Sequence, residues 1–113
     1  MAVYVDNMRA KLGNMVMCHM VADTDDELHA MADRIGVRRR WHQAPRRHDS
    51  HYDIALSKRR AAVEAGAIEV TRKVLGMMTL RRRVCGSLGK PEEASAWCKA
   101  HFTALKAAAG GAA

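Results

Sequence analysis

Residues 48–60 bring imidazole, carboxylate, hydroxyl and basic side chains together within one short stretch of the chain. His51 and Asp53 are separated by Tyr52, so in an extended backbone their side chains share one face. A His–Asp pair can orient a general base, which would turn binding of a phosphate group into cleavage of a phosphoester. We therefore take His51 and Asp53 as candidate catalytic residues. No serine or cysteine nucleophile with a recognisable local context accompanies them.

Basic residues follow this pair at the predicted start of a helix. Ser57 is the predicted N-cap, and Lys58, Arg59 and Arg60 would occupy the first turn, where their charges oppose the helix dipole and repel one another. A bound anion would relieve that conflict, because free backbone N–H groups and basic side chains bind phosphate. The alternative is an ordinary solvated basic face. The predicted phosphate-binding residues are Ser57, Lys58, Arg59, Arg39 and Arg40.

Asp6, His19 and His51 offer a second kind of chemistry, the binding of a divalent metal ion as a cofactor. Asp6 ends a short predicted strand, and His19 is the only polar side chain in an otherwise apolar run. Neutral imidazoles and ionised carboxylates are ligands for Zn²⁺, Mn²⁺ or Mg²⁺. No His-x-x-x-His pair is present, so a hydrogen-bonding role competes with a ligand role for each histidine. His19 in particular must find a polar partner if it is buried.

The strands that would position these residues are predicted at 3–6, 15–22, 37–43 and 67–71. The run 15–22 is nearly all apolar, which favours a strand buried on both faces. The segment 37–43 carries three arginines and is predicted as an exposed strand.

Helices are predicted between these strands and after them. Thr24 and Glu27 form a capping box, in which the hydroxyl accepts the third amide and the carboxylate reaches back to the N–H of the cap. An apolar stripe follows, and Gly36 ends the helix. The second helix begins at Ser57, and a final helix begins near Pro91. The apolar face of the final helix comprises Trp97, Cys98, His101, Phe102 and Leu105.

The order β-β-α-β-α-β predicts a small α/β sheet with at least partly parallel strands, helices on its faces and an appended C-terminal helix. We expect one domain, in which residues 1–71 are the α/β core and 72–106 are a basic connection and the last helix. Residues 107–113 are Ala- and Gly-rich and are predicted to be a flexible tail.

The net charge of +7 is concentrated in residues 38–89, which carry thirteen bases and four acids. Such a field favours polyanionic partners, including non-specific binding of DNA or RNA that weakens with salt. Trp41 alone is too little for a base-stacking platform. Three widely spaced cysteines and the lack of a signal peptide or a long apolar run predict a reduced, cytoplasmic setting with no membrane partner.

Short motifs spread over residues 1–70 together resemble the bacterial and phage family called domain of unknown function 4031. The resemblance implies a small protein of a bacterial cell or phage-infected host, and it supplies no activity or catalytic residue; residues 72–113 are expected to lie outside it. The motifs are Val3-Tyr4-Val5-Asp6, His19, Asp23-Thr24, Glu27-Leu28-His29, Arg34-Ile35-Gly36, His51-Tyr52-Asp53, Lys58-Arg59, Ala62-Val63 and Gly66-Ala67.

Two functions follow from these observations. The first is binding of a phosphate-bearing ligand, a nucleotide or nucleic acid, with metal- or His-assisted phosphoester chemistry. The second is a non-enzymatic interaction protein that modulates a bacterial or phage partner protein, or that forms a homo-oligomer through its C-terminal helix.

Overall fold

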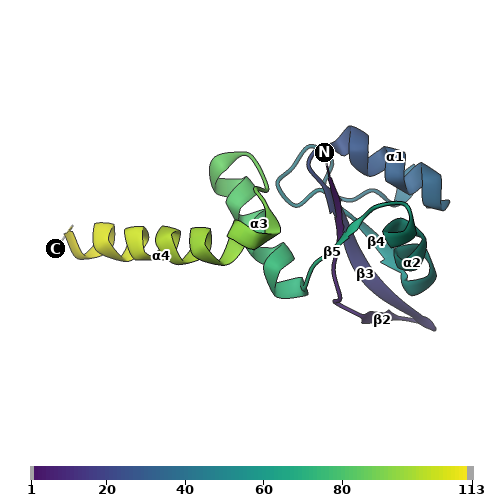
Figure 1. The fold of residues 1–113 in the computed structure, drawn as a ribbon, viewed down its shortest axis with the longest axis horizontal. Coiled ribbons are helices and arrows are strands. Elements are labelled where there is room, and N and C mark those ends of the chain that lie inside the picture. The colour runs from purple at the N-terminus through teal and green to yellow at the C-terminus, as the bar shows by residue number, and fades with distance from the viewer. Residues whose placement is uncertain (1, 112–113) are drawn as a thin grey trace.

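A mixed sheet of five short strands organises the chain in the computed structural model, which describes residues 2–111 (Figure 1). Only the pairing of β1 with β5 is parallel among the described strands. The predicted mixed α/β class is therefore confirmed. The strands are β1 (Val3–Val5), β2 (Ala10–Leu12), β3 (Met15–Ala22), β4 (Tyr52–Ala55) and β5 (Ile68–Glu69).

Strand β3 lies at the centre of the sheet because it is the longest strand and uses both of its edges. Its first half pairs with β2 and its last three residues pair with β1, both antiparallel. The middle of β3 pairs with β4, also antiparallel. Met17 and Met20 each have a strand neighbour on both sides, so β1 and β2 share one edge of β3 and β4 occupies the other.

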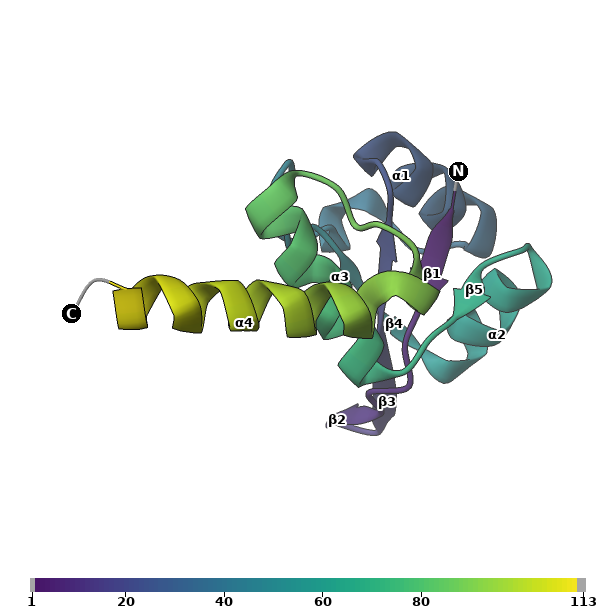
Figure 2. The same ribbon diagram turned by 60° about the vertical axis from the view of Figure 1, so that its left-hand side comes forward.

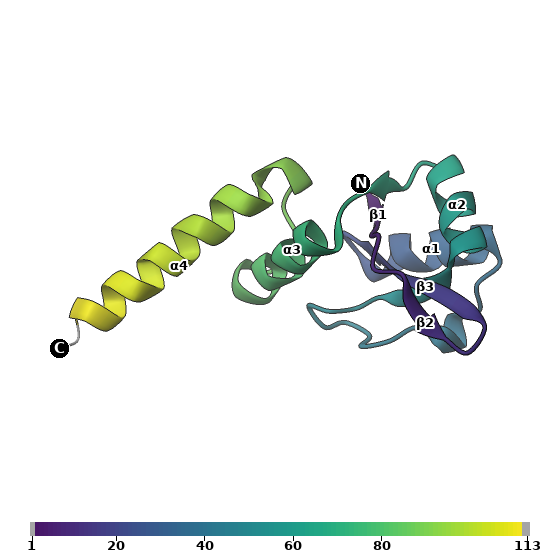
Figure 3. The ribbon, with the colours of Figure 1, turned by 90° about the horizontal axis from the view of Figure 1, so that it is seen from below.

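Side chains alternate between the two faces of the sheet along each strand, and this divides the core into two layers. Helices α1 (Asp25–Ile35) and α2 (Leu56–Glu64) cover one face, and α3 (Arg72–Cys85) covers the other (Figure 3). The first layer is built from Val3, Val5, Met20, Ala22, Leu28, Met31, Ala32, Ile35, Tyr52, Ile54, Ala62 and Ala67. The second, smaller layer is built from Tyr4, Val21, Leu75, Met78, Leu88 and Ala94.

The last helix, α4 (Ala94–Gly111), follows a short 3-10 turn, η2 (Pro91–Glu93), and projects away from the sheet (Figure 2). Ala94 and Cys98 at its start are buried, whereas no side chain of residues 99–110 is. The projection accounts for the elongated shape, which measures 53 × 28 × 24 Å.

Helix α1 begins and ends where the sequence predicts. The backbone N–H of Glu27 donates to the Thr24 hydroxyl at 3.2 Å, and Gly36 closes the helix in the left-handed conformation. The predicted reciprocal bond differs in one detail. The Glu27 carboxylate accepts from the Thr24 hydroxyl at 3.0 Å instead of from the backbone N–H of the cap.

Other predicted boundaries are wrong for identifiable reasons. Residues 37–43 form a 3-10 turn, η1 (Arg39–Trp41), and one isolated bridge between Gln43 and His51, and the strand that pairs with the second edge of β3 is β4, later in the chain. Residues 7–14, which lie between the predicted strands at 3–6 and 15–22, contain the further strand β2. Helix α2 begins at Leu56 with Ala55 as its N-cap, so Ser57 lies inside the first turn and does not cap it.

The C-terminal part is more helical than expected. Residues 72–85 form a regular helix of 14 residues within the segment that was predicted as a basic connection. Helix α4 continues through residues 107–111 of the predicted tail, and residues 112–113 lie outside the described part. No helix within residues 2–111 has the length and apolar character needed to cross a bilayer.

Candidate metal centre

Strand register brings His19, His51 and Asp53 to one point on the sheet. His19 of β3 stands directly opposite Asp53 of β4, so their side chains share a face. His51 lies two residues before Asp53 and joins the same face, as the sequence predicts, while Tyr52 is buried in the opposite layer. The shared face is the one that α3 covers, because Val21, two residues beyond His19, packs with Leu75 and Met78.

His19 is held from behind by Asp6, which is fully buried at the end of β1. The ring Nδ1 lies 2.8 Å from Asp6 Oδ2, and the backbone N–H groups of His19 and Met8 donate to Oδ1. Burial opposes ionisation of Asp6, but these hydrogen bonds outweigh it and hold the pKa of Asp6 below its usual value. The hydrogen bond to Asp6 in turn raises the pKa of His19 above 6.5, against the effect of burial.

His51 and Asp53 are also oriented by partners on their outer sides. His51 Nδ1 lies 2.6 Å from the carbonyl oxygen of Asp49. That oxygen can only accept, so Nδ1 carries the proton. The side-chain amide of Gln43 donates to Asp53 Oδ2 at 2.8 Å. Each of these three side chains, His19, His51 and Asp53, therefore has one polar atom in a hydrogen bond on its outer side and one polar atom that faces the other two side chains.

The atoms that face the centre are all hydrogen-bond acceptors when both rings are neutral. With Nδ1 protonated on each ring, Nε2 of His19 and Nε2 of His51 present lone pairs, and both lie near Asp53 Oδ1, at 3.7 and 3.4 Å. Asp53 Oδ1 is buried and has no hydrogen-bond partner among the described residues. Such an arrangement is unfavourable unless a cation lies at the centre or His19 takes up a second proton, which its raised pKa favours.

The spacing of these atoms fits a tetrahedral ion. Ligands bound at about 2.0–2.1 Å in a tetrahedron lie about 3.3–3.4 Å from one another. The two separations from Asp53 Oδ1 are 3.4 and 3.7 Å, and each of the three side chains offers a ligand atom within 4.8 Å of the others. A shared proton fits less well, because hydrogen bonds between nitrogen and oxygen are about 2.7–3.2 Å long.

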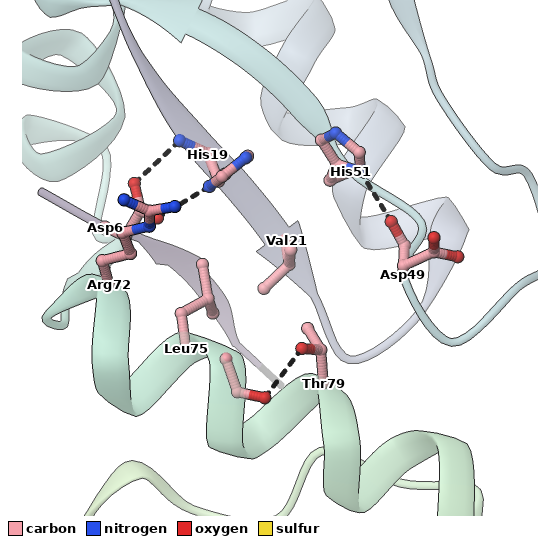
Figure 4. Close-up of a pocket in the computed structure, with 9 residues that line it drawn as sticks. Asp6, His19, Val21, Asp49, His51, Arg72, Leu75 and Thr79 are labelled. Carbon is pink, nitrogen blue, oxygen red and sulfur yellow. Dashed lines mark hydrogen bonds and ion pairs between the residues drawn. The ribbon is translucent and has the colours of Figure 1, made fainter. Parts of the chain in front are cut away.

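A pocket of about 220 Å³ opens between this cluster and α3 (Figure 4). Arg72, the first residue of α3, lies beside Asp6 and His19, and Asp49 lies at the other end (Figure 4). A metal ion held by three protein ligands would keep an open position, which is the arrangement of catalytic sites. The pocket is lined by Asp6, His19, Val21, Asp49, His51, Arg72, Leu75, Gly76 and Thr79.

Comparison with known families assigns the chain. The family described as "Protein of unknown function (DUF4031)" matches residues 3–83, well over half of the 113 residues. The chain belongs to the DUF4031 family. Comparisons with curated proteins and with solved structures returned no match.

The match extends beyond residues 1–70, where the sequence motifs end, and includes most of α3. Thus every residue that lines the pocket of this DUF4031 protein lies within the family region, and α4 lies outside it.

Asp6, one of the three predicted metal ligands, does not converge with the other two, His19 and His51. Both of its oxygens are used in holding His19 and the backbone, so Asp6 supports the cluster from outside it. Asp53, predicted as a partner in general-base catalysis, takes the place of Asp6 among the converging atoms.

The predicted phosphate-binding residues of the DUF4031 protein are engaged elsewhere. Arg59 donates to the carbonyl of Asp6 at 2.7 Å and pairs with Glu69. Lys58 extends toward Gly36 at the end of α1. Arg39 pairs with Asp33, Arg40 lies over the ring of Trp41, and Ser57 is exposed on α2. These contacts differ from one residue to the next and do not converge on one point.

Gln43, Asp49 and Arg72 are the parts of the site that sequence reasoning missed. Asp49 contributes a backbone carbonyl, which any residue could supply, so its identity carries no signal. Gln43 reaches Asp53 only because residues 43 and 51 form a bridge. Arg72 lies at a helix start that the sequence did not mark, although Thr71 does cap it by accepting from the N–H of Val74.

Proposed function

We propose that this DUF4031 protein binds a divalent transition-metal ion, Zn²⁺ foremost, through His19, His51 and Asp53, and that the ion holds a phosphate-bearing ligand in the adjoining pocket. The observation that carries the proposal is the convergence of two Nε2 atoms on the unpartnered Oδ1 of Asp53. Two imidazoles and one carboxylate with outer hydrogen-bond partners are a ligand set suited to zinc.

Arg72 and a bound cation together would favour a phosphate group as the ligand, against the two carboxylates, Asp6 and Asp49, that also line the pocket. Arg72 is exposed at the pocket wall and could pair with phosphate oxygens, as guanidinium groups do. The concentration of thirteen bases in residues 38–89 attracts anions to the same half of the chain. Phosphate would therefore bind to Arg72 and the metal ion, and not at the start of α2 as the sequence predicts.

Phosphoester hydrolysis is the reaction that such a site favours. A Zn²⁺ ion held by His19, His51 and Asp53 would supply a Lewis acid that activates water for this reaction. In the net hydrolysis the water oxygen becomes bonded to phosphorus, the bond from phosphorus to the leaving oxygen breaks, and the leaving oxygen gains a proton. Arg72 would stabilise the charge on the phosphate oxygens.

Calorimetric titration of chelator-treated protein with Zn²⁺ tests the metal proposal. We expect one ion per chain, with affinity reduced more than tenfold in His51→Ala and in Asp53→Asn. His101→Ala, a histidine on α4, serves as the matched control and should bind as the wild type does. Equal zinc affinity in all four proteins would overturn the proposal.

Hydrolysis of bis(p-nitrophenyl) phosphate tests the reaction. We expect turnover that requires added metal and that falls at least tenfold in Arg72→Gln while zinc affinity stays unchanged. Turnover that survives chelator treatment would assign catalysis to His51 and Asp53 without a metal.

The exposed part of α4 supports a second candidate function, self-association. Phe102 is 55% exposed and Leu105 is 52% exposed, and the two lie on adjacent positions of one helix face. In this reading the protein is a non-enzymatic interaction protein, and a second copy covers α4.

Size measurement of the full chain tests this candidate. A double substitution, Phe102→Glu with Leu105→Glu, should convert an oligomer to a monomer. Thr103→Glu with Ala107→Glu adds the same charge on another side of α4 and should leave the oligomer intact. A monomeric wild type would rule the candidate out.

A further inference from the structure

We propose that the groove between α3 and residues 46–51 binds a single strand of nucleic acid, with one backbone phosphate in the metal pocket. This inference rests on the proposed function, because it supplies the substrate class for the same pocket.

A second, basic hollow lies at the far end of α3. It has a volume of about 370 Å³ and is lined by Arg46, Arg47, His48, Arg82, Arg83 and Gly86, with no acidic residue in its lining. Arg46 and Arg83 are exposed, and neither takes part in an ion pair within residues 2–111. Their guanidinium groups are thus available to an external anion.

The two hollows share two of their walls. Helix α3 and the segment 46–51 line both, since Asp49 and His51 border the first and Arg46, Arg47 and His48 border the second. Arg82 fixes these walls together, because its guanidinium donates to the carbonyls of His48 and Ser50 at 2.7 and 3.4 Å. The spacing between α3 and this segment is therefore fixed by the Arg82 hydrogen bonds.

One stripe of α3 runs from the first hollow to the second. Arg72, Gly76, Thr79 and Arg83 are spaced at i, i+4, i+7 and i+11, which places them on one helix face. At 1.5 Å per residue, Arg72 and Arg83 are about 16 Å apart along the axis. With a rise of about 3.4 Å per stacked nucleotide, roughly five nucleotides span that distance.

The size of the metal pocket favours a single strand. Its 220 Å³ is below the range of about 300–1,000 Å³ typical of small-molecule sites, so it suits one phosphodiester unit better than a whole nucleotide or a duplex. Gly76 is exposed between the two basic ends, and a Cβ added to it would meet open space. A strand can therefore pass close to the α3 backbone there.

Fluorescence anisotropy with labelled oligothymidylate and oligouridylate of about eight nucleotides, within the usual size of single-strand sites, tests the inference. We expect Arg46→Gln with Arg83→Gln to weaken binding at least tenfold and to reduce the slope of log K against log salt by about 1.4, or 0.7 per lost phosphate contact. An equal loss of affinity for the two oligonucleotides would indicate recognition of the phosphate backbone. A larger loss for one of them would identify DNA or RNA as the ligand.

The matched control is Arg38→Gln with Arg60→Gln, which removes the same charge at exposed positions outside both hollows. If the control weakens binding as much as the groove variant does, the affinity comes from net charge and the inference fails. Each measurement is made with Zn²⁺ and with chelator. If Arg46→Gln with Arg83→Gln weakens binding equally with Zn²⁺ and with chelator, the strand binds beside α3 without the metal ion, and only the metal proposal fails.

Substitution of Gly76 provides an independent test with little risk of unfolding, because the position is helical and open. Gly76→Glu should weaken oligonucleotide binding and Gly76→Lys should strengthen it, each severalfold, while both proteins unfold at similar denaturant concentrations. Equal affinities in the two variants would contradict passage of a strand over α3.

Discussion

Each candidate ligand depends on a neighbour that fixes which of its atoms faces the centre. For His19 this neighbour is Asp6, whose carboxylate accepts a hydrogen bond from Nδ1 and so leaves Nε2 unprotonated, with its lone pair free. The residue that sets the tautomer of His19 is therefore not one of the three converging side chains.

Asp6→Asn should weaken zinc affinity by about 10–100-fold at pH 8. The amide would present an N–H to Nδ1, so the ring proton would move to Nε2 and block the ligand atom. Calorimetry measures the affinity, and nitrogen NMR of the imidazole reports the exchange of tautomer. Asp33→Asn, at a surface ion pair with Arg39, is the control. An unchanged tautomer in Asp6→Asn would contradict this role.

Asp25 links the start of α1 to the loop before β4, and this contact depends on pH. Its carboxylate accepts from the Ser50 hydroxyl at 2.6 Å and from the Arg46 N–H at 2.8 Å. Burial favours the neutral acid, but these hydrogen bonds outweigh it and hold the pKa of Asp25 below 3.8. Because the folded-state pKa is depressed, the stabilisation is complete above the unfolded value and is lost as the pH falls through the folded value.

Asp25→Asn should therefore lower the free energy of unfolding by roughly 1.5 kcal/mol at pH 7. The difference from the wild type should shrink as the pH falls below 3.8. Urea unfolding at several pH values measures it. Asp26→Asn, in the same helical turn but exposed, controls for the helix dipole. A difference that persists at low pH would show that the hydrogen bonds, not the ionised carboxylate, are responsible.

At the scale of the elements, two glycines have opposite requirements. Gly36 ends α1 at φ 80°, a left-handed conformation that costs any other residue free energy. Gly76 lies within α3 with open space around it, so there the glycine only weakens the helix.

Gly36→Ala should lower the free energy of unfolding by about 1 kcal/mol, and Gly76→Ala should raise it by about 0.5–1 kcal/mol. Denaturant unfolding of the two variants measures both effects. If both variants were destabilised, α3 would require a glycine for close packing that the structure does not show.

At the scale of the whole molecule, Arg82 joins α3 to the sheet and to the loop that leads to the site. Its guanidinium donates to the carbonyls of Ala22, His48 and Ser50. The bond to Ala22 joins α3, whose Leu75 and Met78 belong to the second core layer, to a residue of the first layer.

Arg82→Gln should lower the free energy of unfolding by about 1–3 kcal/mol, because the carbonyls it serves are left without a charged donor. Amide hydrogen exchange should increase in residues 46–51 above all. The adjacent Arg83→Gln, which changes an exposed arginine, should leave both stability and exchange near wild-type values. Uniform changes in exchange across the sheet would argue against a specific role for Arg82 in holding the loop.

Local sequence signals were sufficient to predict an element where its own residues stabilise it. The cap at Thr24, the apolar stripe and Gly36 define α1, and the apolar run 15–22 defines β3, because these patterns act over one or two turns or along one strand. They failed at residues 37–43, whose arginines and Trp41 are compatible with a strand but which form a 3-10 turn and one isolated bridge from Gln43 to His51.

The sequence by itself determined the α/β class, the shared face of His51 and Asp53, and the need of His19 for a polar partner. Only the tertiary structure decided that His19 stands opposite Asp53, that Asp6 lies behind His19, and that Arg72 borders the pocket. The physical reason is that alternation along a strand is a local property, whereas the register between strands depends on how the whole core packs.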